Sequence, residues 1–254
     1  MDYTTELYKL LKDSKNGILI LTGAGVSVKS GIRQFRGENG LYKNKYKGYN
    51  PEELLDINTF WKKNKLCKEF INEFIVNNEG YKPNSIHNYI HDMESVFKIN
   101  GLITQNIDGL HQLAGSTNVV ELHGNLREFY CQKCGQSYNK EEYLKNDYCS
   151  QCKTSYELEY PDNFIRPNIV FYGEWIDEEA LMNADEMFFK SDVVMVIGSS
   201  LEVSTISNYV NTIGNKKLII LNKDETYYDY AADLIIHGDA SEILRSLLYL
   251  KRDI

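Results

Sequence analysis

The chain has 254 residues, of which 43% are hydrophobic and 25% are charged. These values are typical of one large globular domain or two small ones, and they exclude a mainly disordered chain, a collagen and a bundle of membrane helices. The 36 acidic and 28 basic residues give a net charge of −8. That charge argues against a protein that binds nucleic acid through its phosphates.

The sequence also argues against a membrane partner. No apolar run reaches the roughly 18–20 residues of a membrane span, and the start of the chain carries Asp2, Glu6 and Asp13 where a signal peptide would be apolar. We therefore expect a cytoplasmic protein, and we expect it to be a monomer. In that compartment the five cysteines are expected to be metal ligands or buried thiols rather than disulfides.

The predicted elements alternate between helices and buried strands. Apolar side chains at helical spacing predict a first helix over Tyr3–Lys12. Short unbroken apolar runs then recur, as expected of strands buried on both faces of a parallel sheet. Helices predicted between them, at Glu178–Phe189 and Ile206–Ile213, make this an α/β chain with a doubly wound sheet. The runs are Ile18–Leu21, Leu102–Thr104, Val119–Leu122, Val193–Ile197, Leu218–Leu221 and Leu234–Ile236.

Two regions depart from this pattern. Residues 37–100 are rich in Lys, Asn and aromatics and contain a helical stretch, Thr59–Val76, in which Cys67 is expected to be a buried thiol. Residues 127–160 hold the other four cysteines. We interpret 37–100 as a helical insertion and 127–160 as a small metal-bound ribbon. Residues 1–36, 101–126 and 161–254 would then form the α/β domain, with a cleft between it and the insertions.

The four cysteines are spaced as zinc ligands. Cys131 and Cys134 form one Cys-x-x-Cys pair, and Cys149 and Cys152 form a second after 14 intervening residues. Four thiolates at this spacing can surround one tetrahedral Zn²⁺ and leave no open position, which predicts a structural site. The alternative is a pair of redox motifs, but these need a helix N-terminus to lower the thiol pKa, and no helical pattern starts at either pair.

Three polar clusters follow predicted strands. Gly23, Ala24 and Gly25 end the first strand, where backbone N–H groups can hold a pyrophosphate; Val28 stands where a third glycine is usual, so an ordinary tight turn is the alternative. Gln105, Asn106 and Asp108 follow the next strand and could contact a ribose or an amide, or Asp108 could simply cap a helix. His123 follows the third strand and could be a general base or a structural hydrogen-bonding group.

Taken together, these clusters resemble one family, the sirtuins. The resemblance runs from about Gly17 to Asp239 and depends on motifs in a fixed order, together with the two cysteine pairs. The motifs are Gly23–Gly37 (GAGVSVKSGIRQFRG), Thr104–His111 (TQNIDGLH) with Ala114 and Gly115, Glu121–Asn125 (ELHGN), Arg166–Glu174 (RPNIVFYGE), Gly198–Leu201 (GSSL) and Leu221–Asp224 (LNKD).

The resemblance implies an NAD-dependent protein-lysine deacylase with a Rossmann-like large domain, a small zinc-ribbon domain, NAD as co-substrate and a structural Zn²⁺. His123 would be the catalytic base, and Asn106 would also take part in catalysis. A second set of residues would bind NAD, and a third would clamp the acyl-lysine peptide as an added strand. The NAD set is Gly23, Ala24, Gly25, Ser27, Phe35, Arg36, Gln105, Asn106, Ile107, Asp108, Gly198, Ser199, Asn222, Asp224, Asp239 and Ala240, and the peptide set is Val170, Tyr172, Gly173, Leu201 and Val203.

Some residues depart from the family pattern. Arg33 and Gln34 stand where the family usually has Pro and then Asp, so the loop that closes over nicotinamide loses the fixed φ of proline. Tyr172 stands where Phe is common. The Tyr-x-x-Arg pair of relatives that remove acidic acyl groups is replaced by Trp61-Lys-Lys-Asn64, which favours neutral acyl groups.

Two other functions compete with deacylation. The same site could hydrolyse NAD or transfer ADP-ribose to a protein, and the changes at Arg33 and Gln34 could favour that leakage. A protein that binds NAD without consuming it is the non-enzymatic alternative, but it would leave Asn106, Asp108 and His123 unexplained.

Overall fold

The computed structural model describes residues 3–36, 40–76, 80–153 and 160–250. Its larger part is a six-stranded sheet in the order β3-β2-β1-β7-β8-β9, in which every neighbouring pair is parallel. All six predicted apolar runs are strands of this sheet. They are β1 (Ile18–Thr22), β2 (Ile99–Thr104), β3 (Val119–Glu121), β7 (Val193–Ile197), β8 (Lys217–Asn222) and β9 (Leu234–His237).

Helices cover both faces of the sheet, because successive side chains of a strand point to opposite faces. Ile18 and Ile20 share one apolar cluster with α1 (Tyr3–Lys12), α4 (Ser85–Glu94) and α9 (Ala240–Leu250). Leu19 and Leu21 share a second cluster with α7 (Glu178–Lys190) and α8 (Ser204–Asn211). Every residue of β1 is fully buried, and each such Ile or Leu contributes roughly 1.5–3 kcal/mol. The sheet therefore has a hydrophobic core of its own.

The smaller part combines the predicted insertions. Its sheet is antiparallel in the order β5-β4-β6, from β5 (Ser137–Tyr138), β4 (Gly124–Cys131) and β6 (Ile165–Ile169). The helices α2 (Pro51–Leu54) and α3 (Ile57–Ile71) pack against that sheet, and α6 (Lys140–Lys145) follows β5. The Phe60 ring of α3 lies 4.8 Å from that of Phe164 and 4.9 Å from that of Phe171. One apolar cluster thus joins the helical insertion to the cysteine-bearing ribbon.

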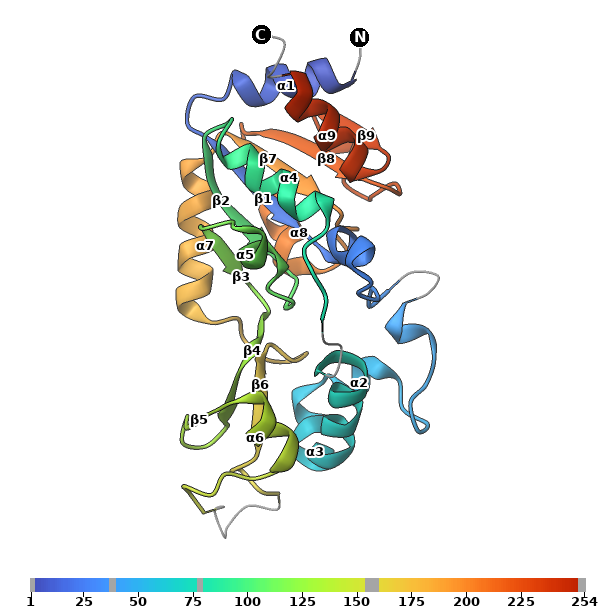
Figure 1. Cartoon of the computed structure of the whole chain (residues 1–254), viewed down its shortest axis with the longest axis vertical. Helices are drawn as coiled ribbons and strands as arrows, with labels where there is room; N and C mark the ends of the chain where they lie inside the picture. The colour runs from blue at the N-terminus through green and yellow to red at the C-terminus, as the bar shows by residue number, and fades with distance from the viewer. Residues whose placement is uncertain (1–2, 37–39, 77–79, 154–159, 251–254) are drawn as a thin grey trace.

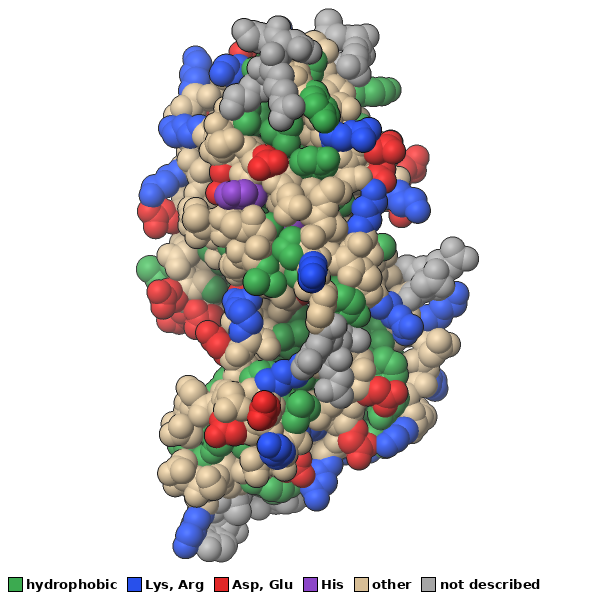
Figure 2. All heavy atoms as spheres, viewed as in Figure 1, with side chains coloured by type: hydrophobic (Ala, Val, Ile, Leu, Met, Phe, Trp, Pro, Cys, Tyr) green, Lys and Arg blue, Asp and Glu red, His purple; other side chains and the backbone are tan. Residues whose placement is uncertain are grey.

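Figure 1 shows the two parts along the long axis of the molecule, with β4 and β6 leading from the large part into the small one. Short elements complete the fold: α5 (Leu110–Ala114), the 3₁₀ helices η1 (Ala24–Ser30), η2 (Leu41–Lys43) and η4 (Asp229–Ala231), and a π-helical turn, η3 (Asn72–Val76), that continues α3. On the face drawn in Figure 2, acidic and basic side chains are interspersed. None of the helices formed by the described residues is long and apolar enough to cross a membrane.

The predicted boundaries need two corrections. Helix α4 lies within residues 37–100, but its apolar side chains Ile86, Ile90 and Met93 belong to the apolar cluster of the large sheet. The helix is therefore part of the large part. Strand β6 lies within residues 161–254 but pairs with β4 in the small sheet. The predicted helix Thr59–Val76 begins two residues earlier, where Asp56 Oδ1 accepts hydrogen bonds from the backbone amides of Asn58 and Thr59. Cys67 is fully buried, as predicted.

Candidate active site

The candidate site lies where the order of the strands in the sheet reverses, on either side of β1. Strand β1 is flanked by β2 on one side and β7 on the other, and ligands of such sheets bind at the carboxyl ends of the strands at this point. The Gly25 amide donates to the Gly198 carbonyl at 2.9 Å. A Cβ on Gly25 would lie 2.7 Å from the Gly198 oxygen, and Gly198 has φ of +61°. The close approach of the two turns explains the glycines at these two positions.

A polar network connects the turns after β1 and β2. The Asn106 side-chain amide donates to the Gly23 carbonyl at 3.1 Å and to Ser27 Oγ at 3.0 Å. Ser27 Oγ donates to Asp108 Oδ2 at 2.7 Å. Asn106 and Ser27 are buried. The predicted residues of these two motifs are therefore brought together and held in fixed orientations.

Two buried histidines support this network from inside the protein. His87 Nε2 lies 3.4 Å from Ser27 Oγ, the His87 and His111 rings are 4.8 Å apart, and His111 Nε2 lies 3.1 Å from Thr22 Oγ1. Burial lowers the pKa of His87 to about 4 and that of His111 to about 3. Both rings are therefore neutral at pH 7 and act as hydrogen-bonding groups beneath the site.

A cavity of about 410 Å³ opens between the two parts of the protein. The large part contributes Ala24, Ser27, Asn106, Ile107 and Asp108, all predicted to bind the cofactor, and Phe35 and Arg33 line it from the loop that follows η1. The small part contributes apolar side chains on the opposite side, among them Leu41, Phe74, Ile75, Val76 and Leu126. Polar and apolar groups therefore both line the cavity, and the charged side chains of Glu73 and Lys140 lie among those of the small part.

His123 lies at the crossing from β3 to β4 and is partly buried among polar partners. Its Nδ1 lies 3.1 Å from the Gln105 carbonyl, and its Nε2 lies 3.1 Å from Thr205 Oγ1. Burial lowers the pKa of the imidazole, so the ring is neutral at pH 7. Its backbone carbonyl accepts from the Val170 amide at 2.9 Å, which connects the histidine to the predicted peptide segment.

The predicted adenosine contacts lie along the same edge, at β7, β8 and β9. Ser199 Oγ donates to Gln105 Oε1 at 3.4 Å, and the Asn222 side chain donates to the Asp224 carbonyl at 2.8 Å. Asp239 precedes Ala240, the first residue of α9, and pairs with Lys29 of η1 at 2.5 Å. The hydrogen bond from Lys29 is the main reason that the pKa of Asp239 falls to about 2. This edge thus continues from the cavity towards β9.

Arg36 points away from the cavity, towards the predicted peptide segments. Its guanidinium donates to the Tyr172 hydroxyl at 3.3 Å and lies 3.5 Å from a Glu52 carboxylate oxygen and 3.8 Å from one of Glu202. The Tyr172 hydroxyl also meets that of Tyr42 at 3.2 Å. Phe35 and Arg36 are neighbours in the chain, but Phe35 lines the cavity whereas Arg36 contacts the predicted peptide segments.

The two predicted peptide segments differ in backbone hydrogen bonding and conformation. The Tyr172 amide donates to the Leu55 carbonyl, and the Tyr172 carbonyl accepts from the Ile57 amide, so an added strand cannot use these groups. Gly173 has φ of +85°, and Leu201, which is buried, has φ of +59°. Leu201 is thus held in a left-handed conformation on the loop that leads to Val203 and α8.

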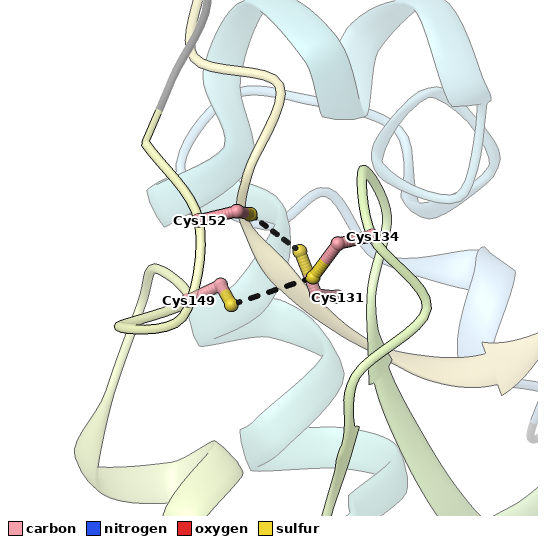
Figure 3. A group of neighbouring side chains, drawn as sticks. All are labelled: Cys131, Cys134, Cys149 and Cys152. Carbon is pink, nitrogen blue, oxygen red and sulfur yellow. Dashed lines mark hydrogen bonds between the residues drawn. The ribbon is translucent and has the colours of Figure 1, made fainter.

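The four cysteines form the predicted cluster (Figure 3). All four sulfurs lie within 4.8 Å of one another, and the Cys131–Cys152 and Cys134–Cys149 sulfur distances are both 3.7 Å. A tetrahedron with Zn–S bonds of about 2.3 Å places its sulfurs about 3.8 Å apart, so the residues fit zinc. The Tyr138 hydroxyl donates to Cys149 Sγ at 2.9 Å, an outer contact of the kind that orients metal ligands.

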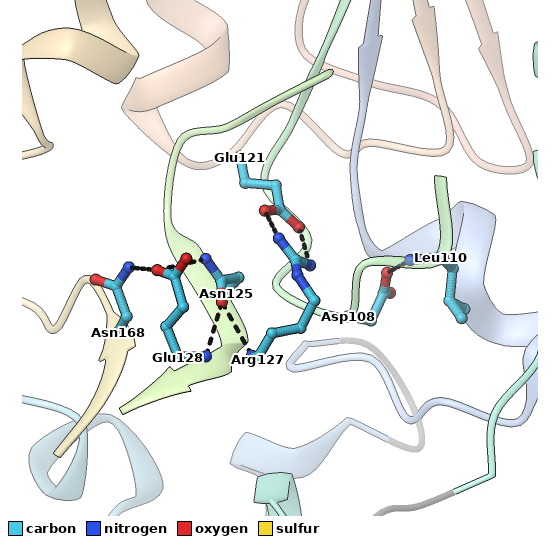
Figure 4. Close-up of polar contacts among 7 residues, drawn as sticks. All are labelled: Asp108, Leu110, Glu121, Asn125, Arg127, Glu128 and Asn168. Atoms are coloured by element: carbon cyan, nitrogen blue, oxygen red, sulfur yellow. Dashed lines mark hydrogen bonds and ion pairs between the residues drawn. The ribbon is translucent and has the colours of Figure 1, made fainter. Parts of the chain in front are cut away.

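Sequence reasoning missed two residues of the site. Arg127 reaches from β4 back to β3, makes a two-pronged ion pair with Glu121 (Figure 4) and lines the cavity. Thr205 contacts both His123 and Gln105. Nothing in the sequence marks either residue, because an arginine in a strand and a threonine at a helix start are ordinary.

Comparisons with known proteins agree with this geometry. The family model described as the Sir2 family matches residues 23–205. An NAD-dependent protein deacetylase of Staphylococcus epidermidis is 38% identical over 94% of this chain and 95% of its own, and one of Clostridium acetobutylicum is 35% identical over 98% and 99%. Among solved structures, Sir2 with a p53 peptide and NAD⁺ has a TM-score of 0.84 at 34% identity, covering 99% of each chain. Sir2 with a propionylated peptide has a TM-score of 0.82 at 33% identity, again covering 99% of each.

Proposed function

The chain belongs to the Sir2 family, and from that premise we propose that it uses NAD to remove acyl groups from protein lysines. The products are nicotinamide, an O-acyl-ADP-ribose and the free lysine. Similar proteins are called NAD-dependent protein deacetylases, and similar structures hold NAD⁺, acylated peptides or O-acetyl-ADP-ribose.

The observation that carries the proposal is the surroundings of His123. The acyl oxygen is a weak nucleophile, and nicotinamide is an activated leaving group, so the enzyme has mainly to align the two and exclude water. After nicotinamide leaves, a ribose hydroxyl must lose its proton to attack the acyl carbon. A partly buried, neutral imidazole beside Gln105 is suited to accept that proton.

The cavity is suited to the nicotinamide half of NAD. Asp108 and Ile107 would hold the carboxamide, Gln105 and Asn106 would bind the adjoining ribose, and Phe35 would cover the ribose once nicotinamide has left. The burial of Asn106 and its two hydrogen bonds support a fixed orientation for these contacts.

The rest of the sheet edge is suited to the other half of the dinucleotide. Gly23, Ala24, Gly25 and Gly198 would lie against the phosphates, with Ser27 and Arg36 nearby. Ser199, Asn222, Asp224, Asp239 and Ala240 would hold the adenosine. Arg36 would then have to leave Tyr172 and Glu202 when NAD binds.

The acyl-lysine peptide would bind between Val170–Gly173 and Leu201–Val203. Because the Tyr172 backbone is already bonded, the side chain of Tyr172 is its contribution, together with Val170, Gly173, Leu201 and Val203. Trp61, in the helical insertion, packs its ring 4.9 Å from Phe164. Trp61 is partly buried against this apolar cluster and carries no charge that could pair with an acidic acyl group, which supports a preference for neutral acyl groups.

Zinc would be held by Cys131, Cys134, Cys149 and Cys152. With four thiolates the ion supplies no open coordination position, and its contribution is to fix the ribbon. We also propose that the protein is a cytoplasmic monomer whose partners are acylated proteins rather than nucleic acids or membranes; the use of four reduced cysteines as ligands supports a reducing compartment.

The test is incubation with NAD and an acetyl-lysine peptide, with products followed by mass spectrometry. We expect loss of acetyl matched mole for mole by nicotinamide and O-acetyl-ADP-ribose. His123→Ala should lower deacetylation by roughly 10²–10⁴-fold, the usual contribution of a general base. Equal nicotinamide release without peptide would assign the protein to NAD hydrolysis, and ADP-ribose attached to a protein would assign it to ADP-ribosyl transfer.

A further inference from the structure

One hydroxyl group connects the two side chains that are proposed to meet the same ribose. Thr205 is the second residue of α8. Its Oγ1 lies 3.0 Å from the Gln105 amide nitrogen and 3.1 Å from His123 Nε2. Gln105 and His123 follow the ends of β2 and β3, whereas Thr205 lies at the start of α8, which follows β7 on the other side of β1.

The direction of these hydrogen bonds follows from which atoms can donate and which can accept. The Gln105 amide nitrogen can only donate, so Thr205 Oγ1 is the acceptor there. The single hydroxyl proton of Thr205 is then available for His123 Nε2, which accepts it when the ring is neutral. The ring proton therefore lies on Nδ1, where it is donated to the Gln105 carbonyl at 3.1 Å. Both contacts select the same tautomer, the one whose Nε2 can accept a proton.

We propose that Thr205 is a positioning residue for deacylation, whose hydroxyl aims His123 Nε2 and the Gln105 amide at one point. The inference rests on the proposed function. The hydroxyl accepts from Gln105 and donates to His123, the same two contacts that a ribose hydroxyl would make in its place. In the free enzyme the Thr205 hydroxyl thus holds both side chains in place. When NAD binds, a ribose hydroxyl would replace the Thr205 hydroxyl at His123 Nε2.

The position of Thr205 also connects the base to the peptide. Val203 is the residue that precedes α8, and Leu201 is buried in a left-handed conformation just before it. A peptide bound along Leu201–Val203 would therefore contact the segment that carries Thr205. The base would be aimed by the same loop that holds the substrate.

The test separates the two halves of the reaction. Exchange of labelled nicotinamide into NAD, in the presence of acyl peptide, reports the step before His123 acts, whereas deacylation needs the proton transfer as well. Thr205→Val keeps the shape of the side chain and removes the hydroxyl. We expect deacylation to fall by roughly 10- to 100-fold, less than for His123→Ala, because the base is misdirected rather than lost, while nicotinamide exchange stays within about twofold of the original protein.

Two further variants complete the design. Thr205→Ser restores the hydroxyl and should restore deacylation. Thr212→Val removes a threonine hydroxyl that bonds to the Asn208 carbonyl, near the other end of α8, and should change neither rate. Equal losses of exchange and deacylation in Thr205→Val would reduce the hydroxyl to a structural role, and unchanged or faster deacylation would overturn the inference directly. Failure of the unmodified protein to deacylate would overturn the proposed function, and this inference with it.

Discussion

The two parts of this molecule differ in what they bury besides apolar side chains. Strands β1, β7 and β8 of the large sheet are lined on both faces by apolar clusters. The small part has an apolar cluster of its own, but it also buries charges. Arg166, 1% exposed, pairs with Glu174 at 2.5 Å, and Lys68 donates to the Tyr143 and Asn146 carbonyls, both at 2.6 Å, and to Asp147. The small part also carries the zinc ligands.

Because of this difference, the part that supplies most of the chemical groups is not the part that is expected to unfold first. The large part supplies most polar groups of the site from a sheet packed between two apolar clusters. The small part supplies one wall of the cavity and depends on a buried ion pair and the cysteine cluster as well as on apolar packing. Buried charges are costly unless each one is paired. The small part is thus expected to be the more easily lost, and the cavity with it.

Removing the metal should have the largest effect. Apparent zinc-binding energies of about 10–16 kcal/mol in zinc-finger peptides show how much folding one ion can support. In Cys131→Ser we expect zinc to be lost, the small part to unfold in a separate transition below that of the sheet, and activity to disappear. Thermal unfolding followed by calorimetry, with metal analysis, tests this.

Cys67→Ala is the matched control, because Cys67 is buried in α3 and is not one of the four ligands. It should keep its zinc. A single transition for both parts in Cys131→Ser would contradict the separate unfolding of the small part.

Breaking the buried ion pair should come next. Arg166→Met leaves the Glu174 carboxylate without its partner and removes a guanidinium that lies 4.4 Å from the Phe171 ring centre. Loss of one member of a buried pair costs about 3–5 kcal/mol, and Glu174 follows the proposed peptide segment. We expect the free energy of unfolding of the small part to fall by about that amount in urea titrations.

The double variant Arg166→Met/Glu174→Leu should recover much of the loss, because no uncompensated charge remains. Equal destabilisation in the single and double variants would mean that packing, rather than charge, holds this contact.

The large part should show its own weakness at low pH. The pKa values of His87 and His111 are lowered by burial to about 4 and about 3, whereas both groups titrate near 6.5 in the unfolded chain. The unfolded state therefore binds more protons below pH 6.5, and stability is complete above that pH and falls as the pH drops from 6.5 towards 4. The loss is at most about 1.4 kcal/mol per pH unit for each group.

Denaturant midpoints between pH 8 and 5 measure this effect. His111→Gln should flatten the dependence. Because desolvation rather than a neighbouring charge is the main cause, raising the salt concentration should leave it nearly unchanged; a strong salt effect would point to a charge partner instead.

The same contrast explains how far the sequence alone could lead. Continuous apolar runs predicted β7 at its observed bounds, and the cysteine spacing and ordered motifs predicted the zinc cluster and the neighbourhood of His123. The position of α4 could not be predicted, because an amphipathic helix does not show which surface covers it. Thr205 is four residues beyond a recognisable motif, and only the three-dimensional approach of α8 to β2 and β3 gives its hydroxyl a role.

The smallest effect should come from the ion pair between Lys29 and Asp239, whose side chains are 42% and 37% exposed. It is the same kind of contact as Arg166–Glu174, but it lies in water beside an apolar core, so Lys29→Met should lower the free energy of unfolding at pH 7 by less than about 1 kcal/mol. The pKa of Asp239 is lowered to about 2, so this contribution is present above about pH 4 and disappears as the pH falls through 2.

Urea titrations of Lys29→Met and of the original protein at low and high salt should converge as the salt concentration rises. A loss comparable to that of Arg166→Met would show that exposure does not separate the two pairs, and it would remove the distinction between the parts that the other experiments assume.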